Sequence, residues 1–544
     1  MSPPSRNSQI NTRSITFCNW RPNKLLHALA KLVLIALCFL VFLVSTVFAF
    51  FPLYVYQCIV VILAKIFRSD LISIVAPRDF CNGLDDVTKK SAYFFQVFVT
   101  YHGEPDIDHI RSTFQTKVME EKDIKNGKLL YEKFTYFIKP WLGYLFWSRE
   151  SNFSLHEHIR LCEDTEHLLL SHPVVTEKDF TNVMGKLSAR PLRQGMSPWE
   201  ILIVRNFVPS KPKIHIGEET KISEGSRFIL IFRIHHAISD GSCCFKILVT
   251  NLSGVPVPEI FSPSTRTWKE TFCSTILIKL TTLVLFGYYQ FKQIVLDVDK
   301  NIWNLSAPQT TGEWLFVQSE KIPLIGLKQM SKSRNVSLTA LFNAGLGAGI
   351  RTFLKGTGQE DKIPETMRVL MPLPWKTHPF TGLVNCWSFG TLIIPLGPCL
   401  QQNLQIAEKS IRNCKKSPIL PVNFAVPPLL ALFPVWLFKI LADLGLVTIL
   451  ASHFPGPKDP IQSFGRYWLD EANSWLDMRG SFCISTSFIT SRGNLRVGVT
   501  VDKAIIPTQE QGDYLAFCIS QEFKNILDID HATRNLEQDD AKIV

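Results

Sequence analysis

Apolar residues crowd near the start of the chain and then spread into shorter, spaced runs. Residues 32–64 read LVLIALCFLVFLVSTVFAFFPLYVYQCIVVILA, 33 residues without a charged side chain. A helix that spans a bilayer needs about 20 apolar residues, whereas the apolar core of a signal peptide has about 7 to 15. The run therefore predicts a permanent membrane segment over residues 32–66 rather than a cleaved leader.

Both sides of this segment are basic. The flanking residues are Lys24, Lys31, Lys65 and Arg68. Basic residues prefer the cytoplasmic side of a membrane, and Pro52 is expected to break or bend a helix. The pattern favours a re-entrant hairpin that returns the chain to the same side. A single crossing stays open, because residues 53–64 are short for a second full crossing.

Beyond residue 70 the apolar runs become shorter and alternate between the periods of strands and helices. They predict strands at 92–101, 228–234, 367–372, 387–395, 482–490 and 495–501, and helices at 106–120, 243–252, 274–291 and 338–354. Alternation of this kind predicts layered α/β domains. An apolar, proline-containing block at 427–446 fits equally well a buried helix and one that dips toward lipid.

These runs divide the chain into six parts. They are a basic cytosolic tail (1–31), the membrane segment (32–66), a first globular half (90–255), a linker with an apolar helix (256–305), a second half (306–530) and a loose polar tail (531–544). We expect the two globular halves to carry any chemistry, since both contain polar residues at the ends of apolar strands.

Composition and charge support a globular protein attached to a membrane. Only 19% of the 544 residues are charged, 46% are hydrophobic and the net charge is +11. A soluble domain has roughly 25% charged residues. The 13 cysteines show no C-x-x-C pair or other metal spacing, so they predict reduced, buried side chains in a cytosolic setting and no metal site.

The stretch FRIHHAISDG, residues 232–241, is the strongest candidate for chemistry. Adjacent strand residues face opposite sides, so only one of His235 and His236 can enter a given cavity. One catalytic and one structural histidine fit this spacing better than a metal chelate. Asp240 also suits a helix N-cap and Gly241 a turn, so the residues alone leave a site and a satisfied core histidine equally open.

Residues 235–241 match H-H-x-x-x-D-G and resemble the signature of the CoA-dependent acyltransferase superfamily, which includes chloramphenicol acetyltransferase and peptide-synthetase condensation domains. Further stretches are similar to the wax ester synthase/diacylglycerol acyltransferase family. They are residues 146–160, 190–204, 367–374 with Asn385, 451–461 and 495–507, where Asp502 closes the last strand. The ordered set covers roughly residues 92–530.

The resemblance implies an α/β (α+β) fold of two chloramphenicol-acetyltransferase-like domains with a tunnel between them. It implies transfer of a fatty acyl group from acyl-CoA to a lipid hydroxyl, giving a wax ester, a triacylglycerol or both. His236 would be the general base, His235 would support it, and Asp240 would be structural and pair with an arginine. No metal or bound cofactor is implied, and acyl-CoA is a co-substrate.

The same resemblance suggests which residues contact substrate. They are Gly241, Trp199, Asn385, Pro455 and Gly456. The residues themselves favour core packing for Trp199. They favour turn or junction roles for Asn385, Pro455 and Gly456. A cytosolic catalytic domain on a membrane, expected at the endoplasmic reticulum, would meet both soluble acyl-CoA and a lipid alcohol. We expect no nucleic-acid partner.

Three departures from the family pattern bear on this hypothesis. Thr339-Ala340 replaces an Asn-Asp pair, Ser197-Pro198 replaces Pro-Leu, and His453 replaces an asparagine. They keep open an alternative, a catalytically inactive lipid-binding or scaffold protein on the same fold. A soluble condensation enzyme is disfavoured by residues 32–64.

Overall fold

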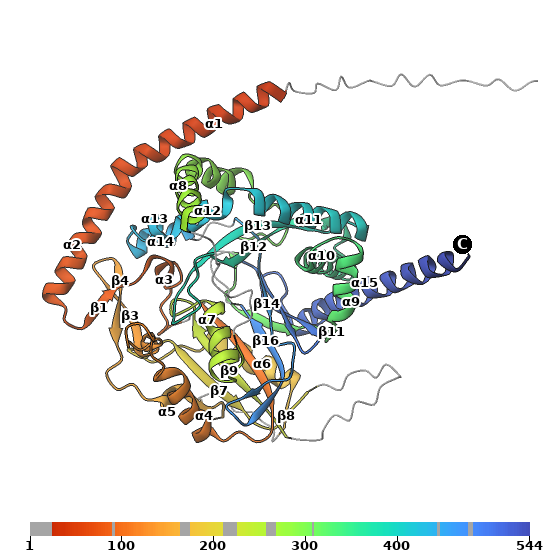
Figure 1. Cartoon of the computed structure of the whole chain (residues 1–544), viewed down its shortest axis with the longest axis horizontal. Helices are drawn as coiled ribbons and strands as arrows, with labels where there is room; N and C mark the ends of the chain where they lie inside the picture. Colours follow the sequence, from red (N-terminus) through yellow and green to blue (C-terminus); the bar gives the residue numbers. More distant parts are fainter. Residues whose placement is uncertain are drawn as a thin grey trace, which may run out of the picture.

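Two mixed β-sheets, one at the centre of each half, organise the molecule in this computed structural model (Figure 1). The structure describes residues 24–89, 93–163, 174–209, 226–256, 268–306, 309–442, 446–476 and 482–543. Within them, the α/β expectation is confirmed, because helices cover sheets made of both parallel and antiparallel strands.

The first sheet has six strands in the order β15-β16-β2-β9-β7-β5. Their bounds are β2 (Phe94–His102), β5 (Ile159–Leu161), β7 (Trp199–Val204), β9 (Arg227–His235), β15 (Gln462–Ser463) and β16 (Tyr467–Trp475). Strands β7 and β9 are buried along almost their whole length, as their apolar sequences predict. The half also contains the short strands β1 (Leu71–Ile74), β3 (Tyr136–Trp141), β4 (Tyr144–Arg149), β6 (Val175–Thr176) and β8 (Phe207–Val208).

The second sheet follows the path β10-β18-β17-β14-β12-β13, with β11 added on β18. Its strands are β10 (Trp314–Gln318), β11 (Ile322–Pro323), β12 (Thr366–Pro374), β13 (Trp387–Pro395), β14 (Ile449–Pro455), β17 (Ile484–Ser491) and β18 (Asn494–Asp502). Asp502 is a structural residue here, since its carboxylate accepts hydrogen bonds from the backbone N–H groups of Thr311, Gly312 and Ala504.

Helices pack around both sheets. In the first half they are α3 (Pro77–Cys81), α4 (Ile107–Phe114), α5 (Leu155–His158), α6 (Glu177–Ala189) and α7 (Gly241–Phe245), the last continued by a π-helix at Lys246–Asn251. In the second half they are α9 (Leu324–Ser333), α10 (Leu338–Gly356), α11 (Leu400–Lys416), α12 (Ile419–Phe424), α13 (Val426–Leu430), α14 (Val435–Ala442) and α15 (Gln509–Ile543). Helix α8 (Trp268–Phe291) connects the halves.

The apolar N-terminal segment is one long, curved helix rather than the favoured hairpin (Figure 1). It consists of α1 (Lys24–Ser45), a π-helical turn (Thr46–Phe50) and α2 (Phe51–Phe67). Pro52 does not break it because it lies at the start of α2, where the wider π turn ends and a missing N–H costs little. Among the described residues this is one helix long and apolar enough to cross a bilayer, judged by length and composition alone.

Three expected boundaries need correction. Strand β16 lies in the second half of the sequence but completes the first sheet, pairing antiparallel with β2 from Leu469↔Tyr101 to Trp475↔Gln96. Residues 71–89, outside the predicted halves, belong to the first half, where β1 pairs with β4. The polar tail predicted at 531–544 is helical up to Ile543, because α15 continues to that residue.

Candidate active site

His236 lies directly after β9, at the point where the buried strand turns toward α7. Strand β9 ends at His235, and the backbone N–H of His236 still donates to the carbonyl of Tyr93, directly before β2, at 2.9 Å. Asp240 then caps α7, its carboxylate accepting from the N–H groups of Ser242 and Cys243 at 3.1 and 3.3 Å. The end of β9 and the N-cap of α7 thus fix the two ends of the short loop that carries His236.

His236 borders an apolar cavity of about 280 Å³ between the two halves. The first half contributes β2 residues such as Val97 and Tyr101, and the second contributes β12, β13, β14 and β16 residues such as Leu370 and Leu469. The polar side chains in the wall are Asn82, Tyr101, His236, Asp240, Ser242, Trp387, Ser452 and Ser474. The lining suits an aliphatic chain with a few polar groups at the reacting end.

The imidazole of His236 is held by an amide network from both halves. Its Nδ1 is 3.2 Å from Asn385 Oδ1, while Asn385 Nδ2 donates to the carbonyl of His236 at 2.8 Å. Asn385 Nδ2 also donates to Asp79 Oδ1 at 2.8 Å, and Lys133 Nζ donates to Asp79 Oδ2 at 2.6 Å. Burial raises the pKa of Asp79, although Lys133 opposes this rise.

This network selects one tautomer of His236. A carbonyl only accepts hydrogen bonds, so the group of Asn385 that faces the His236 carbonyl must be its NH₂. Oδ1 of Asn385 then faces Nδ1, and the proton of the imidazole belongs on Nδ1, which donates to it. Asn82 Nδ2 is 3.2 Å from both atoms and can donate to Asn385 Oδ1. Nε2 of His236 is left as a hydrogen-bond acceptor, as a general base requires.

His235 lies at the end of β9, directly before His236. It is fully buried, and its Nδ1 accepts from the N–H of Ala237 at 3.2 Å. Its Nε2 lies 2.8 Å from Asp85 Oδ1, to which it donates. Both ring nitrogens of His235 are therefore engaged, and this histidine, which does not line the cavity, holds the loop to Asp85 and Ala237.

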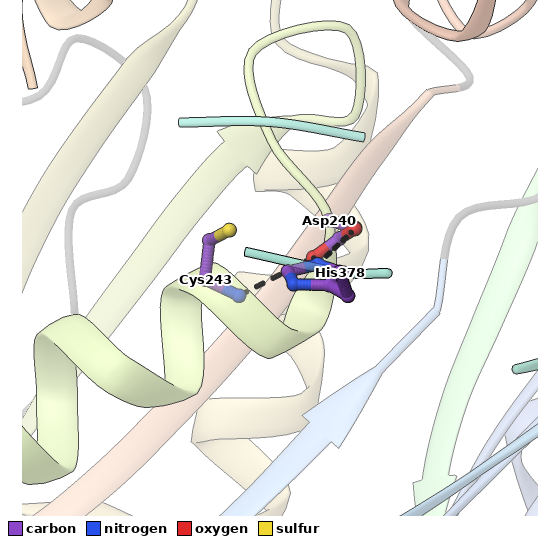
Figure 2. A group of neighbouring side chains, drawn as sticks. All are labelled: Asp240, Cys243 and His378. Carbon is purple, nitrogen blue, oxygen red and sulfur yellow. Dashed lines mark hydrogen bonds and ion pairs between the residues drawn. The ribbon is translucent and has the colours of Figure 1, made fainter. Parts of the chain in front are cut away.

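Asp240 pairs with a histidine, and not with the expected arginine (Figure 2). His378 Nε2 lies 3.0 Å from Asp240 Oδ2, and His378 Nδ1 accepts from the N–H of Phe380 at 2.8 Å. The proton of this ring therefore sits on Nε2 and is donated to Asp240. Burial acts to raise the pKa of Asp240, but the bonds from His378 and from the N–H groups of Cys386 and Cys243 outweigh it and lower that pKa.

Asp240, Cys243 and His378 lie close enough to suggest a metal site, but their chemistry does not fit one. Nε2 of His378 carries a proton and the carboxylate of Asp240 is saturated by donors. Burial raises the pKa of the Cys243 thiol, whereas a metal needs the thiolate. Figure 2 shows the backbone nitrogen of Cys243 hydrogen-bonded to Asp240, while the thiol of Cys243 donates to the carbonyl of Val384 at 3.7 Å. The three residues act as a hydrogen-bonded junction between the halves.

The predicted substrate-contact residues divide into two groups. Gly241 and Gly456 line the cavity, and a Cβ on Gly241 would lie 2.7 Å from the ring of Phe454, which explains the need for glycine there. Asn385 contacts His236 directly. Pro455 ends β14 beside Thr490 and is not among the residues that line the cavity.

Trp199 is the clearest correction, because it lies in the core of the first half and not in the cavity. It is fully buried, donates to Phe134 O at 2.7 Å, and stacks on His158 at 4.5 Å between ring centroids. The neighbouring Glu200 is surrounded by Arg160, Arg190 and Arg233. Residues 146–160 and 190–204, which resemble the family pattern, therefore form part of the core that supports β9.

The departures from the family pattern also lie away from His236. Ala340 is buried in the second-half core at the start of α10, where Ser337 caps the helix. His453 is half-buried, its ring packs on Phe342 and Phe488, and desolvation of the imidazole lowers its pKa to about 3. Ser197 is buried, and its N–H donates to Glu150 at 2.7 Å. None of these residues lines the cavity.

Sequence reasoning missed the residues that reach the site from outside the motif. They are Asp79, Asn82, Asp85, Lys133 and His378. The segment PRDFCNGLD, residues 77–85, contains three of them within nine positions. Its run of polar residues directly after the membrane segment was the one available signal.

A family model covers the second half of the chain. Residues 388–527 match the family model described as WS/DGAT C-terminal domain. The protein named "Probable diacyglycerol O-acyltransferase tgs1" of Mycobacterium tuberculosis strain H37Rv is 20% identical over 354 residues, which cover 60% of this chain and 70% of that protein. A Mycobacterium bovis protein named "Putative diacyglycerol O-acyltransferase Mb3154c" matches with the same identity and coverage.

Solved structures share the fold. The wax ester synthase/diacylglycerol acyltransferase from Marinobacter aquaeolei VT8 has a TM-score of 0.53 at 15% identity and covers 84% of this chain and 100% of that chain. The TRI3 trichothecene 15-O-acetyltransferase from Fusarium sporotrichioides has a TM-score of 0.55 at 11% identity, with 82% and 94% covered. The predicted pair of chloramphenicol-acetyltransferase-like halves is thereby confirmed at the level of the fold. The family model over residues 388–527, the curated relatives and the shared fold thus agree that this chain is similar to acyltransferases of the wax ester synthase/diacylglycerol acyltransferase family.

Proposed function

We propose that this protein is a membrane-attached O-acyltransferase that moves a fatty acyl group from acyl-CoA to a lipid hydroxyl. The acceptor is a long-chain alcohol, which gives a wax ester, or diacylglycerol, which gives triacylglycerol. The observation that carries the proposal is His236, held at the wall of an apolar cavity with its Nδ1 engaged by Asn385. The names of the relatives support the same acceptor class.

The reaction needs one base that later acts as an acid. Nε2 of His236 accepts the proton of the acceptor hydroxyl as its oxygen attacks the thioester carbonyl. The tetrahedral adduct then collapses, the carbon–sulfur bond breaks, and the imidazolium returns the proton to the departing sulfur of CoA. Asn385 keeps the ring in the productive tautomer throughout. A base of this kind contributes roughly 10²- to 10⁴-fold in rate.

Membrane attachment would bring the two substrates together. Acyl-CoA is soluble, whereas the proposed acceptors dissolve in the bilayer. The helix from Leu26 to Phe67 provides the apolar surface for attachment. We place the catalytic halves at the cytosolic face of the endoplasmic reticulum, which agrees with cysteines that are free throughout the described residues.

The test is ester formation by the purified full-length protein. Labelled acyl-CoA is supplied with a long-chain alcohol or with diacylglycerol, both dispersed in detergent. We expect ester from the unaltered chain and at least a roughly hundredfold lower rate from His236→Ala. The matched control is His156→Ala, an exposed histidine, which should retain full activity.

Two outcomes contradict the proposal. Ester formation that survives His236→Ala would remove this residue as the base. Binding of acceptor by the unaltered chain without ester from any acceptor would indicate the alternative, a lipid-binding scaffold. Melting curves of both variants show whether a lost activity reflects lost folding.

A further inference from the structure

The long N-terminal helix packs along the globular body instead of projecting from it. Helix α1 crosses α8 so closely that a Cβ on Gly287 would lie 2.4 Å from the carbonyl oxygen of Cys38. Phe42 packs on Phe286 at 4.8 Å between ring centroids. Further along, Gln57 Nε2 donates to Ala431 O at 2.6 Å. Helices α1 and α2 therefore contact the globular body at several points along their length.

The length of this contact argues against a helix that crosses a bilayer. Contacts begin at Lys31, whose ammonium lies 5.8 Å from the ring of Tyr288, and continue to Ala64, which is buried against the β3–β4 hairpin. At 1.5 Å per residue the contact follows about 50 Å of helix, whereas the hydrocarbon core is about 30 Å thick. A perpendicular crossing would draw the polar body into the hydrocarbon.

The outer side of the same elements is apolar and exposed. Leu32, Phe48 and Ile62 on the helix are 61%, 78% and 56% exposed. Leu277 and Leu280 on α8, and Trp436 and Ile440 on α14, continue this surface. Figure 1 shows α1, α2, α8, α13 and α14 gathered along one edge of the molecule. Exposed apolar surface of this extent marks an interaction site.

The charge of these elements identifies the partner as anionic. Apart from Glu270 in the first turn of α8, residues 24–69, 268–296 and 418–442 contain no aspartate or glutamate. They do contain basic residues, among them Lys31, Lys65, Lys279 and Lys439. An apolar face with several basic residues and almost no acidic ones is typical of a surface that lies in the headgroup region of an anionic membrane.

We propose that α1, α2, α8 and α14 form a single interfacial face that lies in the plane of an anionic bilayer, embedded in one leaflet without crossing it. This geometry refines the membrane attachment of the proposed function and rests on it only for its biological purpose. Helix α14 links the face to the site. Its Trp436 is exposed, and its Phe438 stacks on Phe80, two residues before the cavity residue Asn82.

Vesicle flotation of the purified full chain tests whether α8 and α14 contribute to membrane binding. The variants are Leu277→Glu with Leu280→Glu on α8, and Trp436→Glu on α14. Controls are Ile325→Glu on α9 and Phe517→Glu on α15, which are 69% and 50% exposed elsewhere. We expect the face variants to bind phosphatidylcholine/phosphatidylserine vesicles at least about tenfold less tightly, and the controls to bind normally. Unchanged binding of both face variants would overturn the proposal.

Glycosylation in microsomes tests whether the helix crosses. One acceptor site is engineered within residues 1–20, and the exposed native sites at Asn152 and Asn335 report on the body. An in-plane helix places all of them on the same side, so they should be modified together or not at all. Modification of only the N-terminal site, or only of the body, would show a crossing and overturn the proposal.

The activity assay separates this inference from the proposed reaction. With acceptor dispersed in detergent, the α8 and α14 variants should form ester at the rate of the unaltered chain. Loss of vesicle binding with activity retained supports the face. Loss of activity in detergent would mean that these substitutions damage the fold, and milder Leu277→Ser and Leu280→Ser changes then repeat the flotation.

Discussion

The amide of Asn385 determines what His236 can do. Because its NH₂ faces the carbonyl of His236 and the carboxylate of Asp79, its oxygen must face Nδ1. The proposed general base is thus oriented by a residue about 150 positions away, supplied by the other half. Lys133 in turn fixes Asp79, so a chain of three side chains orients one ring.

Asn385→Ala should lower kcat roughly a hundredfold while leaving KM nearly unchanged. Without the acceptor oxygen, Asn82 donates to Nδ1 and drives the proton to Nε2, the wrong nitrogen for a base. Steady-state kinetics measure the effect, and nitrogen NMR of labelled histidine reports the tautomer. Asn152→Ala, in an exposed loop, is the control. An unchanged tautomer in Asn385→Ala would refute this role.

At this scale the sequence predicted the motif residues but not their partners. His235, His236 and Asp240 follow from local spacing along one strand and one turn. The resemblance suggested an arginine for Asp240, yet His378 fills that place because a backbone N–H leaves its Nε2 as a donor. The resemblance suggested Trp199 as a contact residue, but it packs in the core as the residues themselves favour, since a tryptophan in a motif looks the same whether it packs or binds.

Among the elements, β7 is joined to its neighbours by a buried charge cluster. Glu200 on β7 contacts Arg160 on β5, Arg190 after α6 and Arg233 on β9. Burial alone would raise the pKa of Glu200, but the three arginines overcome this and lower it to about 2. The cluster thus ties three strands and a helix together through a single carboxylate.

Glu200 should make the fold acid-sensitive. Its folded pKa of about 2 lies below its ordinary value of 4.5. Its contribution, on the order of 3 kcal/mol, is therefore present above about pH 4.5 and lost as the pH falls toward 2. Denaturant unfolding of the detergent-solubilised protein between pH 7 and 3 measures it. In Glu200→Gln the free energy of unfolding at pH 7 should fall by about 3 to 5 kcal/mol, and the part of its pH dependence that is due to Glu200 should disappear. If the free energy of unfolding of this variant varies with pH as in the unaltered chain, the assignment is contradicted.

The crossing of α1 and α8 depends on the absence of a side chain at Gly287. Its Cβ would meet the backbone of Cys38, which cannot move aside as a flexible side chain could. The apolar runs predicted a membrane segment at 32–66 and a helix at 274–291 but gave no sign of their contact, because a helix that faces lipid and one that faces protein have equally apolar sequences.

Gly287→Leu should separate the two helices and leave the catalytic halves folded. Hydrogen exchange should rise around Cys38 and Phe42 and stay unchanged in β9. Gly185→Leu, on α6 with open space around its Cβ, is the matched control and should leave exchange at α1 unaltered. Equal exchange at α1 in both variants would argue against the close crossing.

In the whole molecule the two halves are interlocked rather than side by side. Strand β16 leaves the second half to complete the first sheet, and His378 of the second half holds Asp240 of the first. The sequence indicated two α/β halves because each has its own alternation of strands and helices. It could not indicate the exchanged strand, since the pattern of a strand reveals its buried faces and not its neighbour.

A chain ending at residue 305 should therefore fail to fold. It would leave the edge of β2 unpaired, and unpaired edges promote aggregation. Co-expression with residues 306–544 should restore a soluble complex, detected by size-exclusion chromatography. As a control, cleavage at a protease site placed in residues 257–267 of the folded full chain should leave the halves together. A soluble, monomeric 1–305 would contradict the interlock.

The pairing of β16 with β2 also determines when the first sheet can be completed during translation. Strand β2 ends at His102, and its partner β16 begins at Tyr467. At about 5 to 20 residues per second, a ribosome needs roughly 20 to 70 seconds to add the intervening residues. Once β9 has been synthesised, the nascent first half keeps an open edge at β2 until β16 emerges. The protein thus depends on protection during translation, and slow elongation in its second half would lower the yield of active enzyme more than slow elongation in its first.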